Sequence, residues 1–529
     1  MGWNTVAPEV PGAVGSGGSG VTSPSVFNLT SAPYNAKANG QVVTDVSATS
    51  GNPVISSASA NFTPAMTGMS YLLAGGAGSN VPQAGTITYV SATQVSLSVT
   101  PGTNLTNGFL AWGTDDTPAI NAAWVAAQAY MASNPGRSAV ITGPSNIYIL
   151  ASPTTKVVSQ TLHYNSQVPM TPTNTGASMK LTPVWSFGET GRAVPIFGQT
   201  VPQAGSGATF LSTLVGQTVD GTFGIPSVIG GPTDGGNSTN NNQWSNMYPV
   251  VQGLTIVVPL NPTIAGINFR GMAGAAVDVY AGMPFDSVAN IAAVKPTSSW
   301  AAALYMPIEL NNDEAFVGDV AAYGWYYGHA FYAHTSVQSV KSLYCGYGMF
   351  IGGNGNDKHG VNIGMASMEG CGTFLQCDGN ANITVPVNIG LLDCEAVNWF
   401  TGFGGNHIQD PANGLGGTIN VLDNSGDASV LSIAGAANCR ILCANETHDV
   451  KTAPTYTLGT AFQNPWWVPV YITLNTGTTT NIQIGPDSAR CTLVVGTTTA
   501  APVTFLLPSG WWLNITGTVK PSVFNSVPF

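Results

Sequence analysis

Two glutamates recur at the same place in successive repeats of this sequence and could act together as an acid and a base. Glu369 lies in MEGCGTF and Glu395 lies in CEAVNWF, and aligning the repeats places one over the other, with Cys345 in the repeat before. Strands stacked in a sheet are about 4.8 Å apart, close to the ~5–5.5 Å carboxylate separation of glycosidases that retain configuration. Two like charges at this spacing would raise the pKa of one partner, as an acid catalyst requires. Glu369 and Glu395 are therefore predicted as the first candidate catalytic pair, with Asp393 on the same strand.

A second group of carboxylates precedes a run of aromatic residues. The stretch PIELNNDEAFVGD is the densest acidic run in the chain, and its Asp313 and Asp319 form the second candidate catalytic pair. Aromatic rings stack on the apolar faces of sugars while carboxylates bond to sugar hydroxyls, so the neighbouring aromatic residues are predicted to bind glycan. The predicted glycan-binding residues are Tyr323, Trp325, Tyr326, Tyr327 and Trp399.

Both groups also have a purely structural interpretation, which the sequence leaves open. The glutamates could be solvated residues at turns of an outer face, and the aromatic run could be a loop followed by an inward-facing stack. The polygalacturonase pattern of Asp pairs, Gly-His-Gly and Arg-x-Lys is absent, and only 13 Lys and Arg give little support to an arginine base with calcium. Cys439 and Cys443 have no His or Cys pair at zinc spacing nearby, so no metal site and no cofactor is predicted.

The candidate residues lie in repeats that must position them. Four stretches, 316–332, 336–352, 360–376 and 386–402, repeat with a step of 20 to 26 residues and contain apolar, β-branched runs broken by Gly. A period in this range indicates a stacked architecture, because one repeat cannot bury its inner face alone. The sequence therefore predicts an all-β fold, a right-handed parallel β-helix whose flat outer faces are suited to lie along a polymer.

One helix is predicted before the repeats, over about residues 117–132. Asp116 or Thr117 can cap its N-terminus, and Pro118 suits its first turn. The residues that form one apolar stripe along it are Ile120, Ala123, Trp124, Ala127 and Met131.

The segments AKANG (36–40), TDDTPAINAAW (114–124) and AVITGPSNIYIL (139–150), in this order, resemble the pectate-lyase-like β-helix superfamily, in particular phage tailspikes and related virion fibres. The resemblance implies that the helix caps the first coil of the β-helix. It also implies a virion spike protein that attaches to host surface polysaccharide, as a homotrimer. A polysaccharide depolymerase is the first alternative, and a secreted bacterial β-helix adhesin is the second. The N-terminus has no secretory-signal pattern, which counts against the adhesin.

Four regions are predicted. Residues 1–26 form an extended arm that anchors the spike to other virion tail or capsid proteins, and residues 27–112 form an N-terminal segment with a small inserted β-domain. Residues 113–450 hold the cap helix and β-helix, and residues 455–529 form a C-terminal β-sandwich. The tryptophans of this sandwich are expected at a subunit interface; they are Trp466, Trp467, Trp511 and Trp512.

The composition limits the partners. Charged residues make up 7 % of the chain, against about 25 % in ordinary soluble proteins. Lys and Arg do not cluster, so nucleic acid is not an expected partner, and the chain has no apolar run of about 18 residues, so no membrane insertion is expected. The seven cysteines are expected to be reduced and mostly buried. The expected location is the virion, made in host cytoplasm and extracellular once assembled.

Overall fold

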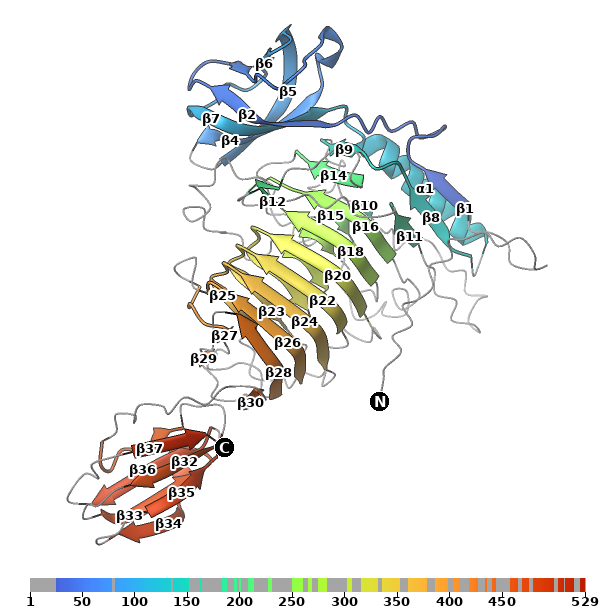
Figure 1. The fold of residues 1–529 in the computed structure, drawn as a ribbon. Helices are drawn as coiled ribbons and strands as arrows, with labels where there is room; N and C mark the ends of the chain where they lie inside the picture. Colours follow the sequence, from blue (N-terminus) through green and yellow to red (C-terminus); the bar gives the residue numbers. More distant parts are fainter. Residues whose placement is uncertain are drawn as a thin grey trace.

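The computed structural model describes residues 25–151 apart from 79–80 and 135–136, the strands and adjoining turns within 162–443, and the strands and turns within 457–528. Within these ranges almost all regular elements are strands, and α1 (Thr117–Ser133) is the one α-helix. Figure 1 shows a small barrel, a body of stacked strands, and a pair of small sheets that follow one another along the chain. The described chain is therefore mainly β, as predicted.

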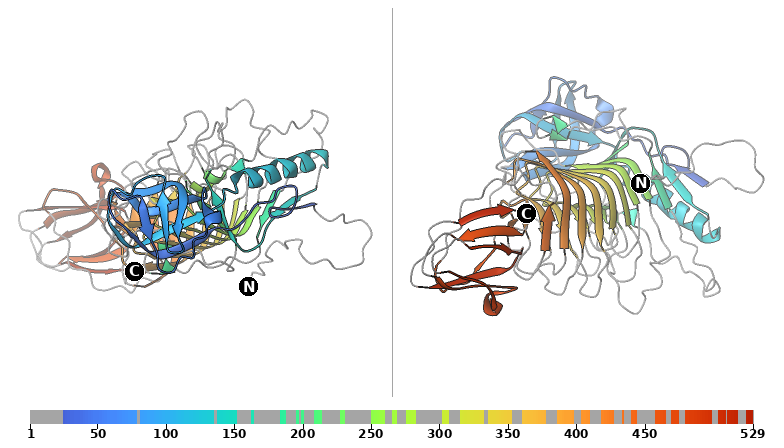
Figure 2. Two further views of the ribbon diagram at one scale, coloured as in Figure 1. Left: turned by 90° about the horizontal axis from the view of Figure 1, so that it is seen from above. Right: turned by 60° about the horizontal axis from the view of Figure 1, so that its bottom comes forward.

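The body consists of two long sheets whose strands alternate along the chain and run parallel to their neighbours (Figures 1 and 2). The first sheet contains, in spatial order, β1 (Ser25–Asn28), β8 (Ala139–Thr142), β11 (Pro183–Ser186), β16 (Val250–Val257), β18 (Ala275–Gly282), β20 (Ala315–Tyr323), β22 (Thr335–Leu343), β24 (Val361–Glu369), β26 (Val387–Glu395), β28 (Thr418–Gly426) and β30 (Arg440–Cys443). Beside it, β9 (Ile147–Leu150) pairs with β14 (Ala208–Ser212), which pairs with β16.

The second sheet has shorter strands. In spatial order they are β10 (Leu162–His163), β15 (Ser227–Gly230), β17 (Ala265–Asn268), β19 (Ala302–Met306), β21 (Tyr327–Phe331), β23 (Tyr347–Ile351), β25 (Thr373–Cys377), β27 (Ile408–Gln409) and β29 (Ile433–Ala434). A strand of the first sheet, the turn after it and the next strand of the second sheet are called one coil below. A short hairpin of β12 (Pro195–Ile196) and β13 (Gln199–Thr200) lies outside both sheets.

The register of the first sheet confirms the repeat step expected from the sequence. Ala315, Thr335, Val361 and Val387 are consecutive register partners, so the steps are 20, 26 and 26 residues. Strands β22, β24 and β26 bury residues on both sides of a central pair that faces outward, as the burial of Ile363 and Ala366 around residues 364–365 shows. A Cβ on Gly390 would lie 2.5 Å from the carbonyl oxygen of Gly364, so glycine is required where the coils approach most closely at this bend.

Helix α1 packs beside the first strands of the body (Figure 1) and agrees with its predicted range to within a residue. All five residues of the predicted stripe are buried, and the ring of Trp124 stacks on Trp185 with centroids 5.8 Å apart. Asp116 occupies the N-cap position but makes no side-chain cap. Its carboxylate instead accepts hydrogen bonds from the backbone N–H groups of Lys37 (2.5 Å) and Ala38 (3.0 Å), because the AKANG segment crosses directly above it.

A closed barrel lies between the AKANG and TDDT segments (Figure 1). Its strands are β2 (Gln41–Ala48), β3 (Val54–Ser56), β4 (Ser70–Gly78), β5 (Val81–Ser91), β6 (Gln94–Leu97) and β7 (Leu105–Gly113), with a 3-10 turn at η1 (Pro64–Met66). Upstream, residues 1–24 of the predicted arm lie outside the described residues. Residues 25–26 begin β1, which pairs in parallel with β8, so this end of the predicted arm is part of the first sheet.

The C-terminal region forms two antiparallel sheets. One contains β31 (Phe462–Gln463), β36 (Trp512–Gly517), β33 (Thr479–Gly485) and β34 (Leu493–Thr498); the other contains β35 (Val503–Leu507), β32 (Val470–Leu474) and β37 (Phe524–Pro528). A 3-10 turn, η4 (Ser488–Arg490), precedes β34. Ile472 and Leu507 from one sheet and Ile482 and Ile515 from the other are buried in the same hydrophobic cluster. Trp511 and Trp512 are half-buried, whereas residues 466 and 467 lie outside the described residues.

The described cysteines agree with the expected redox state. The thiols that are free and buried are those of Cys345, Cys371, Cys377, Cys394 and Cys491. Among the described elements, no helix is both long enough and apolar enough to cross a membrane.

Candidate functional site

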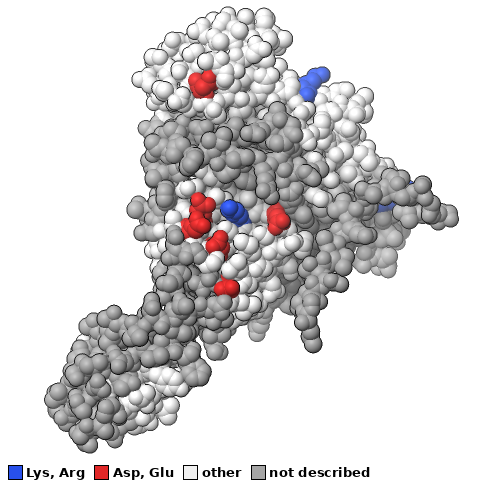
Figure 3. Space-filling model, viewed as in Figure 1, with Lys and Arg blue, Asp and Glu red and all other residues white. Residues whose placement is uncertain are grey.

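One outward face of the first sheet carries the charged residues of the coils from β20 to β28. Along β20 to β28 and their described turns the acidic residues are Asp319, Glu369, Asp393, Glu395 and Asp423, and Lys341 is the only Lys or Arg. Figure 3 shows a group of acidic side chains with one basic side chain among them on this part of the molecule. We call these five acidic residues the acidic face.

Glu369 and Glu395 are register partners at the ends of the adjacent strands β24 and β26. Glu369 is half-buried and Glu395 is exposed, so the two carboxylates share a site but differ in environment. The predicted neighbour in the preceding coil was wrong, because Leu343 pairs with Glu369 there. Cys345 lies two residues further on, where its side chain contacts Cys371. Strands β22, β24 and β26 have equal lengths, so their last residues stack. Cys345 and Cys371, in the turns after β22 and β24, therefore meet in the core.

Asp393 is held on both sides by hydroxyl groups from neighbouring strands. Ser425 donates to one of its oxygens at 2.7 Å and Ser367 donates to the other at 3.4 Å. Ser367 is in turn the register partner of Lys341 on β22. The row that crosses four strands is therefore Lys341, Ser367, Asp393 and Ser425, with one carboxylate among three donors. Asp393 lies two residues before Glu395 on β26, so the two serine hydroxyls fix the orientation of a third carboxylate beside the pair.

The turn after each of these strands has a residue in the left-handed region. Gly324, Tyr344, Gly370 and Ala396 follow the stacked strand ends and have φ values of 78°, 51°, 61° and 54°. The ring of Tyr344 lies over Gly370, where a Cβ would come 2.7 Å from two ring carbons. Burial raises the pKa of Tyr344, and the nearby charges of Glu369, Cys371 and Glu395 raise it further. Its hydroxyl therefore stays protonated near neutral pH and is a hydrogen-bond donor beside the two glutamates.

Sequence reasoning missed Tyr344. The glycines at 324 and 370 mark a left-handed turn, but the tyrosine that occupies the same corner in the coil between them gives no such signal. Its position follows only from the register of the sheet.

A row of asparagines runs along the other end of the same outward face. Asn388 donates from its side-chain amide to Asn362 at 2.8 Å, and Asn420 donates to Asn388 at 2.7 Å. These three residues are register partners on β24, β26 and β28, and Ser336 precedes them on β22. The asparagine row and the serines beside Asp393 thus give this outer face amide and hydroxyl groups that can bond to a polyhydroxylated chain.

The predicted glycan-binding aromatics separate into three groups. Tyr323 and Trp325 have no exposed surface, so they belong to the core and are not available to a ligand. Trp325 is buried because the chain turns inward directly after the left-handed corner at Gly324. Tyr326 and Tyr327 are half-buried, and Tyr327 stacks on Tyr347 with centroids 5.4 Å apart. Residue 399 lies outside the described residues.

The second predicted catalytic pair is not assembled in the described part of the chain. Asp319 is exposed on β20, where it pairs with Ser339 on β22, in a different row from the glutamates. Residue 313 lies outside the described residues. Within the described ranges, no three His, Cys, Asp or Glu side chains are grouped closely enough to hold a metal ion.

Comparison with known proteins gives only distant likenesses. No protein-family model matches the chain. No curated protein matches it either. Among solved structures, an ORF18 protein of Geobacillus virus E2 aligns with a TM-score of 0.28 and 9 % identity over 78 % of this chain and 76 % of its own. A double mutant of the tailspike protein of E. coli bacteriophage HK620, in complex with a pentasaccharide, aligns with a TM-score of 0.25 and 10 % identity over 78 % of this chain and 89 % of its own. The tailspike protein of Pseudomonas phage LKA1 aligns with a TM-score of 0.18 and 11 % identity over 92 % of this chain and 81 % of its own.

Proposed function

We propose that the protein is a virion spike or fibre that attaches to host surface polysaccharide through the outer face of its first sheet. The observation that carries this proposal is the set of polar rows on that face. Rows in register across adjacent strands present the asparagines, the serine-bound Asp393 and the glutamates. Such rows repeat every ~4.8 Å, so they offer hydrogen-bond partners along the length of an extended polymer.

The two parallel sheets are proposed to be one right-handed β-helix. From β16 to β28 each strand of the first sheet is followed by a strand of the second, and the chain then returns to pair with its own previous coil. Connections between parallel strands of one sheet are right-handed in about 98 % of cases. The handedness of a coil built from such connections follows from the same steric preference.

The proposed assembly is a homotrimer that joins the virion through residues 1–26. Trp511 and Trp512 keep exposed surface in the C-terminal sheets. Contact with neighbouring subunits would bury these apolar groups. Host polysaccharide and other virion proteins are the proposed partners.

A second candidate function is cleavage of the bound polysaccharide, and the in-register glutamates beside Tyr344 favour it. In this proposal Glu369, the more buried partner, donates a proton to the leaving oxygen, and the exposed Glu395 is the nucleophile that forms the glycosyl intermediate. Water then releases the sugar, with Glu369 as the base. Asp319 remains the second candidate residue for this chemistry, together with Asp313.

The experiment that tests both functions uses the whole protein and purified surface polysaccharides from candidate host bacteria. Attachment is measured as retention of the protein on immobilised polysaccharide, and cleavage as release of oligosaccharides with new reducing ends. Retention without release supports the spike function alone, and release supports the depolymerase. Both functions would be overturned if the protein bound none of the surface polysaccharides of a host that the virion infects.

A further inference from the structure

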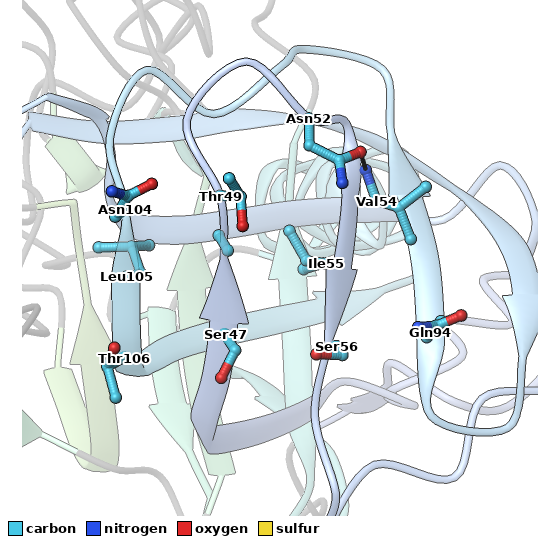
Figure 4. Close-up of a pocket in the computed structure, with 11 residues that line it drawn as sticks. Ser47, Thr49, Asn52, Val54, Ile55, Ser56, Gln94, Asn104, Leu105 and Thr106 are labelled. Carbon is cyan, nitrogen blue, oxygen red and sulfur yellow. Dashed lines mark hydrogen bonds between the residues drawn. The ribbon is translucent and has the colours of Figure 1, made fainter.

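A hollow on the outer wall of the inserted barrel has the features of a separate ligand site, far along the chain from the acidic face. Its volume is about 500 Å³, within the ~300–1,000 Å³ range of small-molecule sites. The residues that line it come from β2, β3, β6 and β7 and from the segments beside them. Figure 4 shows Thr49, Ser47 and Ser56 across the middle of the hollow, with Asn104 and Thr106 on one side and Asn52 and Gln94 on the other.

The hollow exists because two pairs of strands separate at this point. Strand β2 pairs with β3 at a single position, Ser47 with Ser56. Along β7 the register of β2 shifts twice between Val43 and Ala48, which bends the strand. A bulged strand twists away from its neighbour. Here the twist leaves a gap in the wall between two strand pairs, β2–β7 and β3–β6. The buried residues Ala48, Ile55 and Leu105 form the floor of this gap.

The rim of the hollow is held in place by hydrogen bonds within the protein. Ser50 donates from its backbone N–H to the side-chain oxygen of Asn104 (2.8 Å) and from its hydroxyl to the carbonyl of Gly102 (3.0 Å). Gly51 donates to the carbonyl of Pro101 at 2.9 Å. The Asn52 side-chain oxygen accepts from the N–H of Val54 at 3.0 Å, the bond drawn in Figure 4. A rim fixed in this way loses little conformational entropy when a ligand binds.

The polar groups of the lining remain available to a ligand. Asn52 and Asn104 use their oxygens in the bonds above, and among the described residues their amide nitrogens make no further hydrogen bond. No side-chain hydrogen bond to a described residue is formed by Ser47, Thr49, Ser56, Gln94 or Thr106. The lining therefore offers two oriented amide donors, one further amide and four hydroxyl groups.

The lining contains no charged and no aromatic side chain. A phosphate, a uronate or an ammonium group would lose hydration here without gaining a counter-charge. Hydroxyl groups of an uncharged sugar, in contrast, can both donate to and accept from serine, threonine and carboxamide side chains. We propose that the hollow binds a neutral saccharide unit through its hydroxyl groups, independently of the first sheet.

The test measures binding of methyl glycosides of neutral hexoses and of N-acetylhexosamines to the whole protein by saturation-transfer-difference NMR, with methyl glucuronide as the charged counterpart. At least one neutral glycoside is expected to bind, and the glucuronide is not. Addition of the glycoside should slow hydrogen exchange in peptides that cover residues 47–56 and 101–106. Absence of binding by every neutral glycoside, or binding without protection of these peptides, would overturn the proposal.

Two variants of the same barrel complete the test. Thr106→Trp fills the hollow from an exposed strand position, and Thr88→Trp adds the same ring at an exposed threonine outside it. Thr106→Trp is expected to weaken glycoside binding at least tenfold, and Thr88→Trp to leave it unchanged, with equal melting temperatures. Equal binding by both variants would contradict the site. Thr106→Trp should still be retained on host polysaccharide through the acidic face, so failure of the hollow and failure of the proposed attachment give different results.

Discussion

The ring of Tyr344 lies against the backbone of Gly370 in the next coil, and only a glycine leaves room for it. A Cβ on Gly370 would come 2.7 Å from both Cδ1 and Cε1 of the ring, and Gly370 has a φ of +61°. Tyr344 is itself left-handed, with a φ of 51°. Two adjacent corners of the stack therefore accept an unfavourable backbone conformation, and the result is a phenol held beside Glu369 and Glu395.

Replacing Gly370→Ala should lower the free energy of unfolding by about 2 kcal/mol, from left-handed strain and from the clash with the Tyr344 ring. Urea unfolding measures the loss. A double-mutant cycle with Tyr344→Ala separates the two causes, since Gly370→Ala in that background should cost only the backbone strain. If the changes in the free energy of unfolding caused by the two substitutions are simply additive, the ring does not contact Gly370.

His329 should make the stability of the protein fall as the pH is lowered below 6.5. Burial lowers its pKa from 6.5 to about 4, so the folded state favours the neutral ring. The contribution of this shift to the free energy of unfolding is complete above pH 6.5 and is lost as the pH falls through 4. Its full size is about 3 kcal/mol. The ring donates from Nε2 to the Lys341 carbonyl at 3.1 Å, and its register partners Leu304 and Met349 are apolar.

His329→Met tests this prediction, because methionine matches the partner in the next coil. Urea unfolding at pH 7 and pH 5 should show a smaller loss of stability at pH 5 for the variant than for the wild type. His407 has its pKa lowered by burial to about 4 as well, so part of the pH dependence should remain. An identical pH dependence in the variant would show that His329 does not contribute.

Asp116 should make the protein more stable as the pH is lowered, which is opposite to the effect of His329. Burial raises its pKa to about 6, although hydrogen bonds from Lys37 and Ala38 act against the shift. The folded state therefore favours the protonated carboxyl, whose stabilising effect is complete below the unfolded pKa of 3.8 and is lost as the pH rises through 6. The maximum is about 3 kcal/mol.

Asp116→Asn removes this titration and should make the stability fall more steeply between pH 6 and pH 4, since the histidine effect is then unopposed. Asp45→Asn is the matched control. Desolvation raises the pKa of Asp45, but hydrogen bonds from Ser57 and Ser59 outweigh it, so the net shift is downward and opposite to that of Asp116. A steeper slope in both variants, or in neither, would contradict the assignment.

If the protein cleaves polysaccharide, Glu395→Gln and Glu369→Gln should each reduce turnover by about 10²–10⁴-fold. Each substitution removes a reacting carboxylate, while the glutamine side chain keeps nearly the same shape. Oligosaccharide release is the measurement. Asp45→Asn, on β2 of the inserted barrel and outside the acidic face, is the control and should retain activity. Full activity in both glutamine variants would exclude this pair.

Tyr344→Phe extends that comparison to the residue that only the structure revealed. It keeps the ring on Gly370 and removes the donor beside the glutamates. Stability should change by less than about 1 kcal/mol, while polysaccharide retention or turnover should fall about tenfold. Unchanged retention and turnover, with wild-type Glu369 and Glu395 shown to be required, would limit Tyr344 to a packing role.

The elements with local signals were predictable from the sequence. Helix α1 and its buried stripe of Ile120, Trp124 and their neighbours follow from a 3.6-residue period that each short segment carries by itself. The parallel strands of β20 to β26 follow from a repeat step that the coils must share to stack. The pairing of Glu369 with Glu395 was predictable for the same reason, because equal steps place equal positions in register.

The turns between the sheets were decided only by the tertiary structure. Whether Trp325 faces the core or a ligand depends on the left-handed corner before it, and a sequence pattern does not show the direction in which a chain leaves such a corner. Three further features depend on how two coils are aligned with each other. They are the pairing of Leu343 with Glu369, the contact of the Tyr344 ring with Gly370, and the asparagine row. The barrel hollow likewise arises from strands β2 and β3 diverging, which depends on a bulge and not on the residues that line the gap. Contacts between residues distant along the chain set these features, and that is why local sequence patterns did not contain them.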